Sequence, residues 1–155
     1  MSEEHKNFMR EAIRLSVENV ESGNGGPFGA VIVKDGKIIA RGANNVTSSN
    51  DPTAHAEVTA IRKACEALGT FQLDGCEIYT SCEPCPMCLG AIYWARPDAV
   101  YYANTKKDAA DINFDDQFIY DEIERPIGAR KLFTEQMLRE EAIVAFRKWA
   151  ESAGK

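Results

Sequence analysis

Two cysteines and one histidine in this sequence have the residue types and the spacing of metal ligands. Cys85 and Cys88, in the segment PCPMC, lie three residues apart, so on a helix both sulfur atoms face the same side and can reach one ion. His55 lies upstream of them, and an imidazole nitrogen combined with two thiolates is a donor set that suits zinc. The three residues therefore predict one zinc ion per chain.

The fourth ligand decides whether such a zinc site is structural or catalytic. A closed structural site would need one more protein ligand, and the candidates are Cys65, Cys76, His5 and, nearest in sequence, Cys82. Glu57, two residues after His55, argues for a catalytic site, because a carboxylate beside a metal ligand suits a proton carrier. An H-x-E motif followed by P-C-x-x-C is the signature of zinc deaminases, in which the glutamate transfers protons without binding the metal.

The pattern of apolar residues predicts the helices and strands that hold these residues. Helices are predicted over residues 3–21, from the capping residue Thr53 to Leu68, from Pro86 to about Trp94, over 117–124 and over 135–152. Strands are predicted over 29–34, 37–41, 77–81 and 99–103, with Asp35-Gly36 as a hairpin turn and a short extended piece at 131–133. The polar stretch after residue 103 is predicted to be a loop as far as Asp116.

Strands that alternate with helices after an initial hairpin predict an α/β fold, specifically a three-layer α/β/α domain around one central mixed sheet. The strand over 29–34 is expected to be central in that sheet. Both pairs of candidate residues then fall at a helix N-terminus, the usual place for a site in such sheets. A chain of 155 residues can build one core, which predicts a single zinc-dependent domain over 1–155, with 120–155 as a lid or an exchanged segment.

The composition argues against several classes of protein. The chain carries 18 Lys and Arg against 24 Asp and Glu, and this net charge of −6 offers no electrostatic footprint for a nucleic acid. The N-terminal segment lacks the apolar core of a signal peptide, and no stretch approaches the ~18 apolar residues that span a membrane. The sequence therefore predicts a cytoplasmic protein without a nucleic-acid or membrane partner. In that reducing compartment its 5 cysteines are not expected to form disulfides.

Beyond the motifs, long segments resemble the bacterial guanine deaminases of the cytidine-deaminase superfamily. The similarity is carried by GGPFGAVIVKDG at 25–36, NDPTAHAEVTAIR at 50–62, SCEPCPMCLGAIYWARP at 81–97 and FDDQFIY at 114–120. The first two segments are shared in kind with tRNA adenosine deaminases, whereas residues 85–94 and the 114–120 loop point to guanine. The resemblance covers most of the chain to about Tyr120 and is loose beyond it.

The resemblance implies hydrolytic deamination of guanine to xanthine and ammonia. It implies that zinc is bound by His55, Cys85 and Cys88 and that Glu57 is the proton shuttle. Glu83, beside the zinc cysteines, is a further candidate for assisting proton transfer. Its ordinary alternative is a surface residue in a tight turn.

The resemblance also implies which residues bind the purine. Asn44 would hydrogen-bond it, and Phe28 and Trp94 would flank its plane. Asp116 would pair with the amino edge, where guanine presents adjacent N–H donors that a carboxylate with two oxygens complements. Which acid reaches the pocket stays open, because the same loop contains Asp108, Asp111 and Asp115. The ordinary alternatives are a turn residue for Asn44, core packing for the two aromatic residues and a solvated loop acid for Asp116.

Other functions remain open at the level of sequence. A tRNA adenosine deaminase would share the zinc, the glutamate and the fold but should show a basic groove. Deamination of nucleosides or other heterocycles is a further alternative, and a zinc-stapled binding module is the non-enzymatic one. The expected partner is a small-molecule purine, and the resemblance implies a homodimer paired through the zinc-bearing helices. Phe146 and Trp149 of the predicted C-terminal helix would cover the pocket of their own chain or of a partner, or would simply pack in the core.

Overall fold

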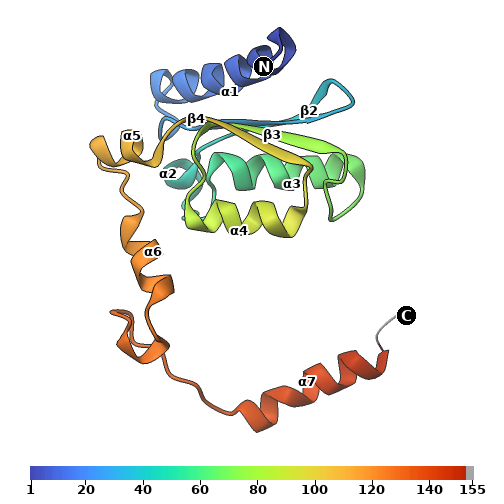
Figure 1. The fold of residues 1–155 in the computed structure, drawn as a ribbon, viewed down its shortest axis with the longest axis vertical. Coiled ribbons are helices and arrows are strands. Elements are labelled where there is room, and N and C mark those ends of the chain that lie inside the picture. The colour runs from blue at the N-terminus through green and yellow to red at the C-terminus, as the bar shows by residue number, and fades with distance from the viewer. Residues whose placement is uncertain (153–155) are drawn as a thin grey trace. The chain divides into compact units, whose positions relative to one another are not determined.

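A four-stranded mixed sheet forms the centre of the first of two compact units in the computed structural model, which describes residues 1–152. This unit spans Met1–Asp116, and its strands are β1 (Gly29–Lys34), β2 (Lys37–Ala43), β3 (Cys76–Cys82) and β4 (Ala99–Asn104). The strand order is β2-β1-β3-β4, with β1 antiparallel to both neighbours and β3 parallel to β4. Helix α1 (Glu3–Glu21) lies on one face of the sheet, and α3 (Ala56–Leu68) and α4 (Pro86–Ala95) lie on the other (Figure 1). The predicted three-layer α/β/α fold is confirmed.

Strand β1 lies between β2 and β3, and its apolar side chains are buried on both faces of the sheet. Ala30 and Ile32 pack in the cluster formed with α3 and α4, whereas Val31 and Val33 pack with α1 on the opposite face. A strand buried on both sides reads as a continuous apolar run, as GAVIVK does. The predicted Asp35-Gly36 turn joins β1 to β2 with φ angles of 51° and 74°, which suits a type I′ hairpin turn.

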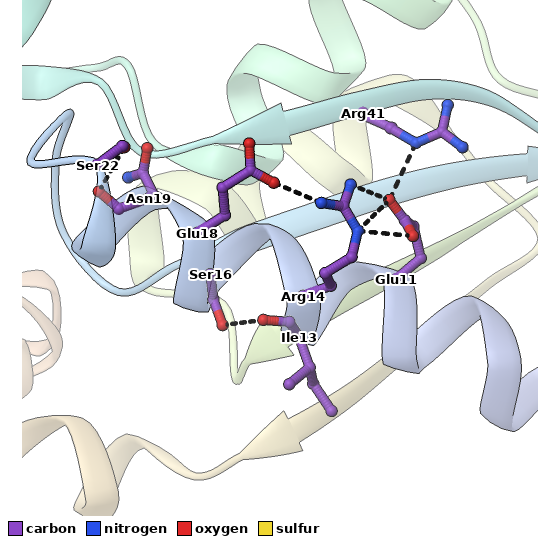
Figure 2. A network of polar contacts seen from close by, with 8 residues as sticks. All are labelled: Glu11, Ile13, Arg14, Ser16, Glu18, Asn19, Ser22 and Arg41. Carbon is purple, nitrogen blue, oxygen red and sulfur yellow. Dashed lines mark hydrogen bonds and ion pairs between the residues drawn. The ribbon is translucent and has the colours of Figure 1, made fainter.

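Charged side chains fasten helix α1 to the edge of the sheet. The helix has the predicted bounds and begins after Ser2, whose hydroxyl accepts a hydrogen bond from the backbone N–H of His5. Figure 2 shows the Glu11 carboxylate between Arg14 of the same helix and Arg41 of β2, at 2.6 and 3.2 Å. These contacts, above all the hydrogen bond with Arg14, hold the pKa of Glu11 below its usual range. The network therefore ties α1 to strand β2.

Of the two helices on the other face, α4 begins where it is predicted to begin and α3 does not. Helix α3 begins later than predicted, because its N-cap is His55 and not Thr53. The Thr53 hydroxyl donates instead to the Asp51 carboxylate at 2.7 Å, within the preceding turn. Helix α4 begins at Pro86, as predicted, and Cys85 is its N-cap.

Two short helices, α2 (Val46–Ser49) and α5 (Lys106–Asp111), lie in stretches where the sequence predicts no helix. Helix α5 has a capping box: the Thr105 hydroxyl accepts from the backbone N–H of Asp108, and the Asp108 carboxylate accepts from the backbone N–H of Thr105. Its sequence, KKDAAD, has no apolar periodicity, so the pattern of apolar residues does not predict this helix. Reciprocal capping stabilises the start of this short helix.

The second unit begins at Gln117, and its described residues are 117–152. It contains α6 (Gln117–Glu124), as predicted, the short 3₁₀ helix η1 (Ile127–Ala129) and α7 (Arg139–Ser152), which begins later than predicted. Residues 131–133 form no strand. Helix α7 buries none of its side chains, and Phe146 and Trp149 are each 75% exposed. In residues 1–152, no helix is long and apolar enough to cross a membrane.

Candidate metal centre and active site

The N-termini of helices α3 and α4 carry the predicted metal ligands. His55 is the N-cap of α3, Cys85 is the N-cap of α4, and Cys88 lies in the first turn of α4. The two helices lie on the same face of the sheet (Figure 1). Gly42 of β2 allows the close approach of α3, since a Cβ at this position would lie 2.4 Å from the carbonyl oxygen of Ala56. Helix packing on one sheet face therefore joins ligands that are far apart in sequence.

The three ligand atoms lie at distances that fit zinc. Nδ1 of His55 is 3.5 Å from Sγ of Cys85 and 3.5 Å from Sγ of Cys88, and all three atoms lie within 4.8 Å of one another. Tetrahedral zinc, with bonds of ~2.0 Å to nitrogen and ~2.3 Å to sulfur, holds such atoms about 3.5 Å apart. Among the residues that the structure describes, no other group of three His, Cys, Asp or Glu side chains is placed in this way.

The alternative ligands for a closed structural site lie outside this group. The Cys82 thiol donates to the backbone carbonyl of Thr105 at 3.7 Å, and burial raises the pKa of Cys82 to about 11. Nδ1 of His5 is hydrogen-bonded to the Tyr79 hydroxyl at 2.6 Å. The remaining alternatives, also outside the ligand group, are Cys65 and Cys76. No fourth protein ligand within residues 1–152 joins the three, which leaves a position for water or substrate, as in catalytic zinc sites.

Glu57 lies beside the three ligands without joining them. It occupies the first turn of α3 and is buried, with 6% of its surface exposed. Burial raises the pKa of Glu57 to about 7, and the negative charge of nearby Cys85 acts in the same direction. The Thr80 hydroxyl, close to the carboxyl group, favours the charged form. A carboxyl group with a pKa near neutrality can both accept and release a proton at physiological pH.

The start of helix α4 favours the thiolate form of Cys85, whereas the hydrogen bond with Cys85 and burial raise the pKa of Cys88. A hydrogen bond from the Cys88 thiol holds the pKa of Cys85 well below its usual range, and His55 contributes to the same shift. The backbone N–H of Cys88 also donates to Sγ of Cys85, at 3.4 Å. The pKa of His55 is raised, chiefly by its hydrogen bond with Cys85. Because the thiolate is the form that binds zinc, the fold favours Cys85 as a ligand.

Two predicted purine-binding residues, Phe28 and Asn44, lie next to each other at the open end of the β1–β2 hairpin. Asn44 is buried, and its backbone N–H donates to the carbonyl oxygen of Phe28 at 3.2 Å. The side-chain Oδ1 of Asn44 accepts from the backbone N–H of Val46 at 3.2 Å. The backbone N–H of Asn45 donates to the carbonyl of Ala54 at 3.0 Å, which joins this loop to the residues before α3.

Asp116 lies close enough to the metal ligands to be affected by the charge of Cys85. The carboxyl group is partly buried, and burial raises its pKa, with the negative charge of Cys85 contributing in the same direction. Phe114, two residues earlier, packs edge-on against Phe28, with ring centroids 5.1 Å apart and an interplanar angle of 85°. This aromatic contact fixes the loop before Asp116 to the end of the hairpin that carries Phe28.

Two further predicted site residues, Glu83 and Trp94, lie outside the ligand group. Oε1 of Glu83 accepts from the backbone N–H of Lys106 at 3.0 Å, at the start of α5. Trp94 is 79% exposed in the last turn of α4, separated from Pro86 by about 12 Å of helix. The structure therefore does not bring Trp94 next to the metal ligands of its own chain, and the roles of both residues stay predictions.

Three residues that contact the site are not among those predicted from the sequence: Thr80, Phe114 and Asn19. Thr80 lies beside Glu57, and Phe114 packs on Phe28. The buried side chain of Asn19, in α1, donates to the backbone of Asn44. Only Asn19 had a sequence signal, because it is a polar residue on the helix face that also buries Ala12 and Ser16.

The chain has clear relatives of known activity. Residues 2–104 match the family described as the cytidine and deoxycytidylate deaminase zinc-binding region. The chain is 61% identical over 151 residues to a guanine deaminase of Bacillus subtilis (strain 168), and the match covers 97% of each protein. An X-ray structure of guanine deaminase from Bacillus subtilis matches with a TM-score of 0.95 at 60% identity, covering 100% of this chain and 98% of the other. A tRNA-specific adenosine deaminase of Agrobacterium fabrum is 53% identical over 76 residues, which are 49% of this chain and 50% of that protein.

Proposed function

This chain belongs to the cytidine and deoxycytidylate deaminase family of zinc-binding proteins, and on that premise we propose that it is a guanine deaminase, which hydrolyses guanine to xanthine and ammonia. The observation that carries the proposal is the nearly full-length similarity to a guanine deaminase, which continues past residue 104, where the family region ends. The similarity to a tRNA-specific adenosine deaminase covers only about half of the chain.

The metal ligands in this proposal are His55, Cys85 and Cys88, supported by the spacing of their donor atoms. Bound there, zinc supplies the Lewis acid that makes water a nucleophile near neutral pH. Glu57 accepts a proton from the attacking water and passes it to a ring nitrogen of guanine. The carboxylate then takes the proton of the new C2 hydroxyl, which becomes the carbonyl, and delivers it to the amino group as its bond to C2 breaks and ammonia leaves. Burial of Glu57 supports this role, because it brings the pKa near neutrality.

Recognition of the purine is assigned to residues around the hairpin end. Asn44 donates from Nδ2, because its Oδ1 already accepts the Val46 N–H, and the ring of Phe28 flanks the purine. Asp116 accepts from the N–H groups of the guanine edge, which its partial burial near Cys85 supports. The family resemblance adds Trp94 as a residue that flanks the purine, and its neighbourhood to the zinc cysteines in sequence adds Glu83 as an assistant in proton transfer; both roles stay predictions.

The assembly proposed for the chain is a cytoplasmic homodimer that acts on a small-molecule purine, with no nucleic-acid or membrane partner. Residues 1–155 then act as one zinc-dependent deaminase domain, with 120–155 as a lid or an exchanged segment. The exposed aromatic residues Trp94, Phe146 and Trp149 support this assembly, because large exposed apolar groups mark interaction surfaces. A chain truncated after Thr134 should lose guanine turnover while it keeps its zinc, and light scattering should show whether the dimer is lost with it. Normal turnover by the truncated chain would contradict a role for this segment.

A substrate panel tests the proposed function directly. The zinc-loaded protein is given guanine, adenine, cytosine and a tRNA anticodon stem, and ammonia release is measured for each. We expect turnover of guanine to exceed that of the others by at least ~100-fold. A site whose acceptors pair with the N–H donors of guanine leaves those acceptors unpaired when the substrate lacks the donors. Preferential deamination of the tRNA stem would overturn the proposal in favour of the tRNA-specific relatives.

A further inference from the structure

The side chain of Asn19 connects helix α1 to both loops that carry the proposed purine-binding residues. Nδ2 of Asn19 donates to the carbonyl oxygen of Gly26 at 2.8 Å and to that of Asn44 at 2.7 Å. Asn19 is 6% exposed and lies in the last turn of α1. Its own carbonyl accepts from the backbone N–H of Asn24 at 3.1 Å and from the Ser22 hydroxyl at 3.2 Å, the second contact being drawn in Figure 2. Both amide hydrogens and the backbone carbonyl of this one residue are thus used.

We propose that Asn19 is a positioning residue for purine recognition, which acts through the backbone of Asn44 and through the loop that leads to Phe28. The inference rests on the proposed function of the site, because it concerns how the purine is held there. The backbone N–H of Asn44 is bonded to the Phe28 carbonyl, and its carbonyl is bonded to Asn19. Asn19 and Phe28 therefore fix both polar groups of the Asn44 backbone.

This arrangement determines which group of Asn44 is available to a ligand. Oδ1 is held by the backbone N–H of Val46, and an N–H facing the amide nitrogen would be repelled, which assigns the oxygen to that side. Nδ2 of Asn44 makes no hydrogen bond within residues 1–152, so it is the donor left for an acceptor on the purine. With the backbone fixed by Asn19, this donor has a defined position relative to the ring of Phe28.

The tight packing at Gly25 is a second, independent observation that the two loops and α1 are in direct contact. A Cβ at position 25 would lie 2.1 Å from the carbonyl oxygen of Asn44 and 3.0 Å from Nδ2 of Asn19. No side chain fits in that space, so the chain before Phe28 passes directly against the backbone of Asn44. The amide of Asn19 supplies the donors for the two buried carbonyl groups that meet there.

Replacement of Asn19 by aspartate tests the linkage, because it keeps the shape and turns the donor group into an acceptor facing two carbonyl oxygens. We expect Asn19→Asp to raise KM for guanine at least tenfold while kcat falls less than threefold and the zinc content stays at one per chain. Asn19→Ala, which removes both donors without adding charge, should act in the same direction and replaces Asn19→Asp if that variant does not fold. The matched control is Ser16→Ala on the same buried helix face, since the Ser16 hydroxyl donates only to Ile13 of its own helix (Figure 2).

A double-variant cycle separates positioning from a general loss of structure. Since Asn19 acts partly through Asn44, Asn19→Asp should raise KM by a smaller factor in the Asn44→Ala background than in the wild type, and the remaining effect reflects the loop that leads to Phe28. An equal tenfold loss in both backgrounds, or a wild-type KM in Asn19→Asp and Asn19→Ala, would overturn the inference. So would a Ser16→Ala variant that is as impaired as the Asn19 variants.

Hydrogen exchange makes the test independent of guanine turnover. If the wild-type protein fails to deaminate guanine, the proposed function is wrong, and the linkage is judged by exchange of the Asn44 amide proton. That proton is bonded to the Phe28 carbonyl and should exchange at least tenfold faster in Asn19→Asp than in Ser16→Ala. Equal exchange rates in the two variants would overturn the linkage itself.

Discussion

Replacement of the buried carboxyl group of Glu57 by glutamine is expected to lower activity and raise stability. Glutamine keeps the size of the side chain but can neither accept nor release the proton. Loss of a general acid–base group lowers the rate by typically ~10²- to 10⁴-fold. Since Glu57 lies outside the ligand group, the zinc content should stay at one per chain. We therefore expect Glu57→Gln to keep its metal and to lose at least ~100-fold in kcat.

The expected gain in stability follows from the raised pKa of Glu57. The pKa is about 7 in the fold, against an ordinary value of 4.5, because burial disfavours the charged form. Between these two values the folded chain binds more protons than the unfolded chain, so the free energy of unfolding of the wild type falls as the pH rises. The full difference is worth about 3 kcal/mol above pH ~7. Glutamine does not titrate, so Glu57→Gln should gain up to about that amount at pH 8 and little at pH 4.

Three measurements on the same preparations check both effects. Initial rates with guanine give kcat, and metal analysis gives zinc per chain. Urea unfolding at pH 8 and pH 4, carried out after removal of zinc because its charge would favour the carboxylate, gives the free energy of unfolding. Glu66→Gln is the matched control, because Glu66 is an exposed residue of the same helix and should change none of them. A Glu57→Gln variant with near wild-type kcat would remove Glu57 from the mechanism. One that is no more stable than the wild type at pH 8 would refute the reasoning from burial.

Three further substitutions address the metal, the specificity and the acid stability. Cys88→Ala should lose most of its zinc by metal analysis, whereas Cys82→Ala should keep one zinc per chain; loss of zinc from Cys82→Ala would instead support a closed structural site. Asp116→Asn should lower kcat/KM for guanine about tenfold or more with unchanged zinc, because an unpaired polar group in the site costs ~1 to 3 kcal/mol; unimpaired guanine turnover would place recognition elsewhere. Glu11→Gln should lose less stability than the wild type between about pH 5 and pH 3. The contacts with Arg14 and Arg41 lower the pKa of Glu11 in the fold, so the stabilisation they give is present above the unfolded pKa and is lost as the pH falls through the folded one. Parallel acid unfolding curves of the two proteins would contradict this.

The sheet and its covering helices could be predicted because their signals are local. The apolar run of β1, the Asp35-Gly36 turn and the proline at the start of α4 each act within a few residues. The start of α3 was predicted wrongly because Thr53, a favoured N-cap type, bonds to Asp51 instead, while the actual N-cap His55 uses its side chain elsewhere. Helix α5 could not be predicted from apolar periodicity, which its residues lack, although T-K-K-D fits a capping box.

The metal centre could be predicted more completely than the surroundings of the purine. Type and spacing are sufficient to indicate a possible metal site, and the three donor atoms do lie together. The neighbours of Glu57 and Phe28 could not be predicted, since Thr80 and Phe114 reach them only through the tertiary fold. The role of Trp94 came from the family resemblance alone and stays a prediction.

The order of the two units along the chain has a consequence for biosynthesis. All three candidate ligands and every strand of the sheet are complete at Asn104, ahead of the second unit. At ~5 to 20 residues per second a ribosome needs about 2 to 8 s to proceed from Asn104 to Phe146, and N-terminal domains generally fold first. The sheet can therefore close and take up its metal before the exposed aromatic residues of α7 are synthesised. Vectorial synthesis keeps the aromatic side chains of this helix away from an unfinished core, where they could otherwise pack in the wrong place.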